Sequence, residues 1–132
     1  MWQHVADHNL LGKYYAEPKR WAYTFQNYAI LTRMHALHKL LSSPIAPNSY
    51  LFSERSVEGD KHIFAKLLHK QGLMDDMEHA LYLKVFDSLQ SLHQPAPIHK
   101  HIYLRTDPQR CWERMQKRGR GEESQVTLDY LN

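Results

Sequence analysis

Residues 50–56 read Tyr-Leu-Phe-Ser-Glu-Arg-Ser, a short apolar run followed directly by a charged turn. The near-continuous hydrophobicity of residues 50–52 predicts a strand that is covered on both faces, as in parallel sheets. A second run of this kind occupies residues 101–105, His-Ile-Tyr-Leu-Arg. Helical patterns separate the two runs, so the sequence favours an α/β fold with short parallel strands, flanking helices and right-handed crossovers.

Helical periodicity precedes the first strand. Residues 9–16 predict a short helix, which ends where Pro18 disfavours helical backbone in the residue before it. Pro18 can itself occupy the first turn of a second helix, which the apolar spacing extends to about Leu41. Residues 42–49 are rich in Ser, Pro and Asn and predict a loop.

Three more helices are expected after residue 56. The first reaches Gly72, the second runs from about residue 75 to 92, and the third runs from Pro108 to about Arg118 with Asp107 as its N-cap. The apolar residues of the 75–92 helix recur mostly at i, i+4 steps and predict its buried face: Met77, Leu81, Val85, Leu89 and Leu92.

Composition limits the class of protein. The 132 residues are 42% hydrophobic and 23% charged, which is typical of one globular domain. The formal charge of +3 is too small to indicate a nucleic-acid partner, and one cysteine excludes an internal disulfide. Residues 1–8 lack the features of a signal peptide, and no apolar run could span a membrane. Two strands alone make no stable sheet, so we expect another chain or a larger domain to complete it.

A cluster of arginines near the end of the chain could bind phosphate. Residues 117–123 read Lys-Arg-Gly-Arg-Gly-Glu-Glu, and Arg114 lies one helical turn before Arg118. Converging guanidinium groups neutralise the charge that spreads over a transferring phosphoryl group. The alternative is a solvated basic helix end that is stabilised by its own dipole. The spacing alone leaves both open.

Two further pairs point to ligand binding. Glu54 and Arg55 follow a predicted strand, and open α/β sheets bind ligands at that edge. Phe25 and Gln26 place a ring beside an amide that can pair with the edge of a base. The alternatives are a structural ion pair and ordinary core residues.

The ten histidines and one cysteine do not predict a metal site. The histidine pairs are His4 with His8, His35 with His38, and His99 with His101. None has a third ligand at a known spacing. Cys111 is expected to be a buried helix residue.

Taken in order, the motifs resemble those of the deoxynucleoside kinases, and the resemblance covers essentially the whole chain. The matching pieces are Trp2, Tyr14-Tyr15, residues 18–21 (Pro-Lys-Arg-Trp), residues 25–28 (Phe-Gln-Asn-Tyr), residues 53–56 (Ser-Glu-Arg-Ser), residues 102–106 (Ile-Tyr-Leu-Arg-Thr) and residues 118–123 (Arg-Gly-Arg-Gly-Glu-Glu). The resemblance implies a partial P-loop-kinase-like, Rossmann-type three-layer fold. It also implies transfer of the γ-phosphate of ATP, with Mg²⁺, to the 5′-hydroxyl of a deoxynucleoside.

The resemblance assigns roles to individual residues. It implies that Gln26 bonds the base, Phe64 stacks on it, and Arg33 and Asp60 meet across it, favouring deoxycytidine or a purine deoxynucleoside. The remaining implied roles are pocket walls for Trp2, Tyr14 and Phe25; the sugar 3′-hydroxyl for Tyr15 and Glu123; the 5′-hydroxyl and phosphates for Arg55; magnesium for Glu54; and a phosphate-covering lid for Arg114, Arg118, Arg120 and Glu122.

The sequence departs from the family pattern at both ends. It contains no G-x-x-x-x-G-K-[ST] motif, and the resemblance places the P-loop, its strand and the general-base glutamate before Trp2. The last strand would follow Asn132. We therefore expect residues 1–132 to be a partial kinase domain that is inactive by itself, a homodimer, and cytoplasmic or mitochondrial rather than secreted.

Two other functions stay open. One is a non-catalytic helical interaction or dimerisation module derived from the kinase. The other is a basic nucleic-acid module, which the neighbouring acids Glu122 and Glu123 disfavour because they would repel phosphates.

Overall fold

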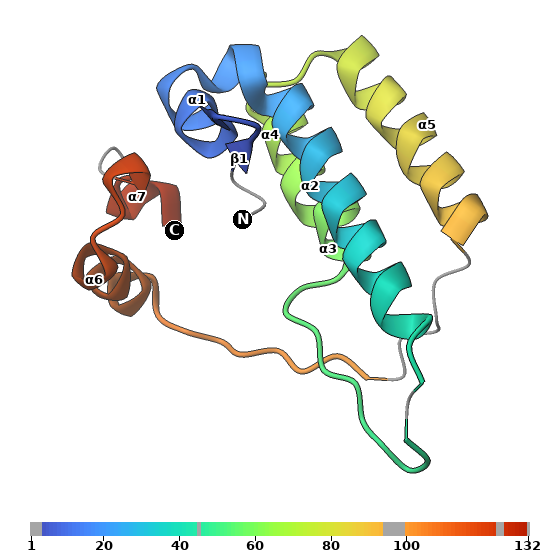
Figure 1. Ribbon diagram of the computed structural model, residues 1–132. Helices are drawn as coiled ribbons and strands as arrows, with labels where there is room; N and C mark the ends of the chain where they lie inside the picture. The colour runs from blue at the N-terminus through green and yellow to red at the C-terminus, as the bar shows by residue number, and fades with distance from the viewer. Residues whose placement is uncertain (1–3, 45, 94–99, 124–125, 132) are drawn as a thin grey trace. The chain divides into compact units, whose positions relative to one another are not determined.

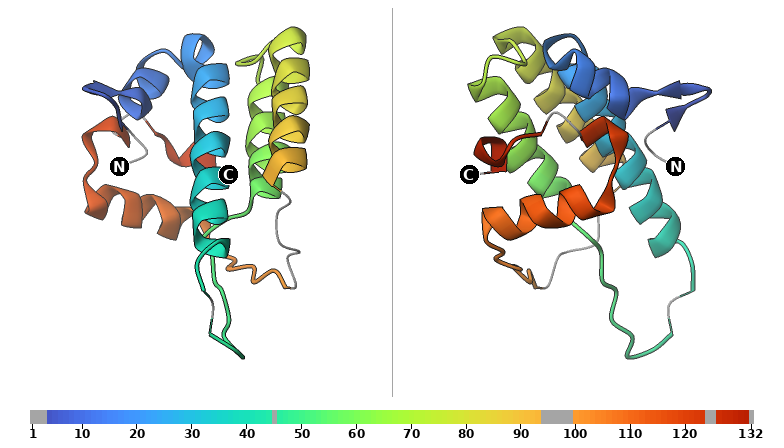
Figure 2. Two further views of the ribbon diagram at one scale, coloured as in Figure 1. Left: turned by 45° about the vertical axis from the view of Figure 1, so that its right-hand side comes forward. Right: turned by 90° about the vertical axis from the view of Figure 1, so that its left-hand side faces the viewer.

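The computed structural model describes residues 4–44, 46–93, 100–123 and 126–131. The chain divides into two compact units, Met1–Pro97 and Ile98–Asn132. The long helices belong to the first unit. There, α2 (Pro18–Leu41), the α3–α4 segment (Val57–Lys70) and α5 (Asp76–His93) run alongside one another (Figures 1 and 2). Trp2 lies outside the described residues.

The first unit begins with a small hairpin and two helices. Strands β1 (His4–Val5) and β2 (His8–Asn9) pair in antiparallel fashion. Asn9 then caps α1 (Leu10–Ala16), because its Oδ1 accepts a hydrogen bond from the Gly12 backbone N–H at 2.8 Å. Helix α2 (Pro18–Leu41) follows with proline in its first turn. The predicted extents of both helices are confirmed.

A continuous helical segment follows the loop after α2. It consists of α3 (Val57–Gly59), the π-helix η1 (Asp60–Ala65) and α4 (Lys66–Lys70). Ser56 caps it, and Gly72 ends it in the left-handed conformation at φ +70°. Helix α5 (Asp76–His93) starts in a capping box, in which Asp75 and Glu78 each accept the other's backbone N–H.

The core of this unit lies where α2, α5 and the α3–α4 segment meet. Its fully buried large side chains are Tyr82, Phe86, Ile30 and Met74. The expected apolar face of α5 is wrong in part, because Met77, Leu81 and Leu92 are exposed, whereas Leu89 packs against the core. Tyr82 and Phe86 point inward instead, since the aromatic rings bury more apolar area than the aliphatic side chains that they displace.

The predicted parallel strands at residues 50–54 and 101–105 are wrong for the described chain. Neither segment is a strand, and the one sheet among the described residues is the β1–β2 hairpin. Most of their large apolar side chains are strongly exposed, including Phe52 at 76% and Tyr103 at 84%. A strand requires backbone hydrogen bonds from a neighbouring strand, and within the described residues neither segment has one.

The second unit is built around α6 (Pro108–Arg118), whose extent is confirmed as predicted. Asp107 caps its start by accepting the Gln109 N–H at 2.9 Å. Gly119 ends it in the left-handed conformation at φ +64°. A short 3₁₀ turn η2 (Gly121–Glu123) and helix α7 (Leu128–Leu131) follow.

Candidate functional site

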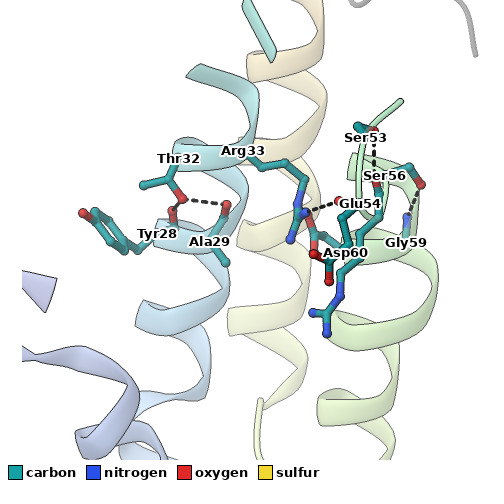
Figure 3. Close-up of polar contacts among 10 residues, drawn as sticks. Tyr28, Ala29, Thr32, Arg33, Ser53, Glu54, Ser56, Gly59 and Asp60 are labelled. Carbon is teal, nitrogen blue, oxygen red and sulfur yellow. Dashed lines mark hydrogen bonds and ion pairs between the residues drawn. The ribbon is translucent and has the colours of Figure 1, made fainter. Parts of the chain in front are cut away.

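An arginine on α2 binds an aspartate at the start of η1. Arg33 Nε donates to Asp60 Oδ2 at 2.6 Å, and Arg33 Nη1 donates to the backbone oxygen of Glu54 at 3.3 Å. Figure 3 shows the Arg33 side chain reaching from α2 toward both groups. Asp60 is only 3% exposed. One guanidinium therefore connects α2 with the turn at residues 53–56 and with η1.

Burial controls the protonation of Asp60. Desolvation raises the pKa of the Asp60 carboxyl above its ordinary value of 3.8, while the charge and hydrogen bond of Arg33 and the charge of Arg55 lower it. A buried carboxylate is costly unless a partner compensates for the lost hydration. The ionised form of Asp60 therefore depends on Arg33.

The turn at residues 53–56 places a second arginine beside an aromatic ring. Arg55 has a φ of +65°, a left-handed conformation that costs a non-glycine residue about 1 kcal/mol or more. Ser53 Oγ donates to the Arg55 carbonyl at 3.1 Å, and Ser56 Oγ accepts the Gly59 N–H at 3.1 Å. The Arg55 guanidinium carbon lies 4.8 Å from the centroid of the Phe64 ring. These contacts hold an exposed cation next to η1.

The π-helix brings Asp60 and Phe64 into this region. Helices with i→i+5 hydrogen bonds are rare and recur at functional sites. Four positions of the α3–α4 segment are buried at steps of three, five and three residues: Val57, Asp60, Ala65 and Leu68. The five-residue step coincides with η1. Sequence analysis missed this feature, because an α-helix and a π-helix require the same residue types.

A second cluster joins α1 and α2. The ring of Phe25 stacks on Tyr14, with centroids 4.7 Å apart and planes 12° from parallel, and Tyr15 lies 5.3 Å from Tyr14. The adjacent Gln26 is 5% exposed, and its Oε1 receives no hydrogen bond from the described residues. Stacked rings beside an unpaired amide oxygen suit a flat ligand that carries a donor.

In the second unit, two of the predicted phosphate-binding arginines already form ion pairs with a carboxylate. Arg118 Nη2 lies 2.7 Å from each carboxylate oxygen of Glu123, and Arg120 Nη1 lies 3.6 Å from Oε1. Glu123 is buried, whereas Arg114 is exposed. The structure brings together Arg118, Arg120 and Glu123. The side chain of Glu122 lies outside the described residues.

The described residues contain no group of three or more His, Cys, Asp or Glu side chains arranged to hold a metal ion. Glu54 offers an exposed carboxylate by itself. Magnesium in phosphoryl-transfer sites commonly uses one or two protein carboxylates together with water and phosphate oxygens. Glu54 fits that requirement as one ligand. Within the same residues, no helix has the length and apolarity to cross a membrane.

Sequence analysis also missed Tyr82. It is fully buried on α5, and its hydroxyl has no hydrogen-bond partner among the described residues. Burial raises the pKa of Tyr82, the charge of Asp60 raises it further, and the charge of Arg33 opposes this rise. The polar tip of an aromatic residue within an apolar helix pattern was the available signal.

Comparison with known proteins identifies the family. The family model for deoxynucleoside kinases matches residues 1–132. This chain belongs to the deoxynucleoside kinase family. Deoxynucleoside kinases have a P-loop kinase fold. The residues described here form mostly helices.

The relatives are kinases named for two different deoxynucleosides. The chain is 44% identical to deoxycytidine kinase 2 of Gallus gallus and 38% identical to deoxycytidine kinase of Mus musculus. It is 37% identical to the mitochondrial deoxyguanosine kinase of Xenopus laevis. Each match covers 93% of this chain and 48% of the relative. The chain thus spans about half the length of these kinases.

Proposed function

We propose that this chain binds the acceptor in a kinase reaction that transfers the γ-phosphate of ATP to the 5′-hydroxyl of a deoxynucleoside. The observation that carries the proposal is the Arg33–Asp60 pair. Arg33 lies on α2 together with Gln26, and Asp60 lies on η1 together with Phe64. Family membership supports the reaction class.

The base is recognised by complementary polar groups. Asp60 accepts a hydrogen bond from an exocyclic amino group, and Arg33 and Gln26 bond the remaining polar edge. Phe64 stacks on the ring, while Tyr14, Tyr15 and Phe25 enclose the nucleoside. Thymine lacks an exocyclic amino group, so a buried Asp60 would be left without a donor from it. Deoxycytidine and purine deoxynucleosides are therefore preferred.

The phosphate end uses the arginines. Arg55 lies beside the 5′-hydroxyl, and Glu54 supplies one carboxylate to the Mg²⁺ that accompanies ATP. Arg114, Arg118 and Arg120 bind the phosphate oxygens, and Glu123 gives up part of its contact with Arg118 to reach the sugar. Arginine is suited to this task because its planar donors match phosphate geometry. Homodimer formation and a cytoplasmic or mitochondrial location stay predictions.

Direct binding tests the proposal. Calorimetric titration of the chain with the four deoxynucleosides should give tighter binding of deoxycytidine and the purine deoxynucleosides than of thymidine. The double substitution Arg33→Met with Asp60→Ala should reverse this preference by removing the polar groups. A wild-type preference for thymidine would refute the proposal.

A control for this experiment lies on the same helix. Thr32 neighbours Arg33, but its hydroxyl donates to the Tyr28 and Ala29 carbonyl oxygens of its own helix, as Figure 3 shows. Thr32→Ala should leave the order of the four affinities unchanged.

A further inference from the structure

The hydroxyl of Tyr82 is buried and has no hydrogen-bond partner among the described residues. Tyr82 is 0% exposed, and α5 packs against both η1 and α2. Only three buried side-chain polar atoms lack a hydrogen bond among the described residues: Gln26 Oε1, Asn27 Oδ1 and the Tyr82 hydroxyl. A buried hydroxyl that bonds nothing forfeits its hydration without compensation. A state of the protein in which this hydroxyl is bonded would recover that cost.

Helix α5, which carries this hydroxyl, packs against the two elements that carry Asp60 and Arg33, namely η1 and α2. Burial raises the pKa of Tyr82 well above its ordinary value of 10, the charge of Asp60 raises it further, and the charge of Arg33 lowers it. The phenol therefore stays protonated at neutral pH, and toward a carboxylate it acts as a donor.

Asp60 has room for a second donor. Arg33 contacts Oδ2 alone, and in the described part of the chain no side chain donates to Oδ1. The carboxylate is almost completely buried and depends on this single side-chain partner. If Arg33 turns toward a ligand, the buried carboxylate of Asp60 loses the charge and the hydrogen bond of this partner, which is strongly unfavourable unless other donors replace them.

We propose that Tyr82 is a positioning residue for Asp60: when Arg33 moves away from the carboxylate, the Tyr82 hydroxyl donates to it and holds it in place. The identity of the ligand that draws Arg33 away rests on the proposed function. The exchange of donors can be tested without a ligand, because substitution of Arg33 removes the first donor in the unliganded chain. It gives the otherwise unpaired hydroxyl a partner in the second state.

A double-mutant cycle without ligand tests this exchange. The urea midpoint of the full chain is measured for wild type, Tyr82→Phe, Arg33→Met and the double variant. Tyr82→Phe should leave the midpoint unchanged or raise it when Arg33 is present, because the hydroxyl then bonds no other described residue. In the Arg33→Met background it should lower the midpoint by about 0.5 M, because the last donor to Asp60 is lost.

The control removes a hydroxyl from the same unit. Tyr23 lies on α2 and packs against the core, ten residues or about 15 Å of helix from Arg33. Tyr23→Phe should have the same effect in both backgrounds. Arg33→Leu is a second background if Arg33→Met does not fold. Equal effects of Tyr82→Phe in both backgrounds overturn the proposal, whatever the ligand measurements give.

Binding supplies an independent measurement. Tyr82→Phe should weaken deoxycytidine binding about fivefold and leave thymidine binding unchanged, because only deoxycytidine donates a hydrogen bond to Asp60 under the proposed function. An equal loss of affinity for both nucleosides would contradict this positioning role. If wild type binds no deoxynucleoside, the proposed function fails, while the unfolding cycle still decides the role of Tyr82.

Discussion

Arg33 and Asp60 lie 27 positions apart in the chain and meet at 2.6 Å between Nε and Oδ2. Asp60 is nearly fully buried, whereas the Arg33 side chain keeps 27% of its surface exposed. The carboxylate of the pair therefore lies inside the protein, and the guanidinium lies nearer the surface. A ligand that approaches from solvent encounters the guanidinium before the carboxylate, so the cation is the group that can change partners.

Asp60→Asn should alter how stability depends on pH. The folded-state pKa of Asp60 is raised above 3.8, so its contribution to stability is present below pH 3.8 and is lost as the pH rises through the folded-state pKa. Urea unfolding of both proteins between pH 3 and 7 should show wild type losing stability relative to Asp60→Asn as the pH increases. A difference that grows in favour of wild type would mean that Arg33 outweighs burial.

Under the proposed function, Arg55→Ala should abolish most phosphoryl transfer in a kinase assay. We expect turnover to fall about 100-fold or more, because a guanidinium that neutralises developing phosphate charge is lost. Arg55→Lys should restore part of it. Circular dichroism should show unchanged helix content, since the side chain is exposed and its main contact is with the Phe64 ring. Normal turnover in Arg55→Ala would remove its phosphate role.

Arg118→Ala should loosen the second unit as well as reduce turnover. Without Arg118, the contact that the buried carboxylate of Glu123 keeps within the described part of the chain is the 3.6 Å one with Arg120. Hydrogen exchange should therefore accelerate in η2 and at the end of α6. Arg110→Ala, in the first turn of the same helix, is the control. Unchanged exchange at residues 115–123 would show that the Glu123 contacts do not stabilise this segment.

His79→Gln should make the first unit less sensitive to acid. The His79 ring stacks on His69 with centroids 4.2 Å apart, and His69 Nε2 lies 2.8 Å from Asp76 Oδ1. Burial and the charge of His69 lower the pKa of His79 below 6.5, while Asp76 opposes them. Its contribution to stability is present above pH 6.5 and is lost as the pH falls through the lowered pKa.

Melting temperatures at pH 7.5 and 5.0 measure this effect. Between pH 7.5 and pH 5.0, the melting temperature of wild type should fall by more than that of His79→Gln. His35→Gln, an exposed histidine on α2, should resemble wild type. The same loss in wild type and His79→Gln would exclude the ring stack as its source.

Local signals predicted the helices well. Asn9, Pro18, Asp107 and Gly119 start or end helices through contacts with residues a few positions away, and the chain carries those preferences in its sequence. The site residues on these helices could be named from the family resemblance. Their roles stay predictions, although Arg33 donates to Asp60 and the Arg55 guanidinium lies over the Phe64 ring.

Features that depend on distant partners were not predictable in the same way. A strand at residues 50–54 requires a neighbour that no local pattern specifies. The inward position of Tyr82 depends on how α5 rotates against α2 and η1. The widened turn of η1 depends on competing i→i+4 and i→i+5 bonds that the same residues satisfy.

The five-residue step between the buried residues Asp60 and Ala65 makes this part of the chain sensitive to length. In a regular α-helix, five residues correspond to a rotation of about 140° beyond a full turn. Deleting one residue from Asp60–Ala65 would allow an ordinary α-helix with good hydrogen bonds and would shift Asp60 relative to Leu68 by one position. Helix content would survive such a deletion. Asp60 and the buried Leu68 would then face different directions relative to one another, so at least one of them would lose its present contacts.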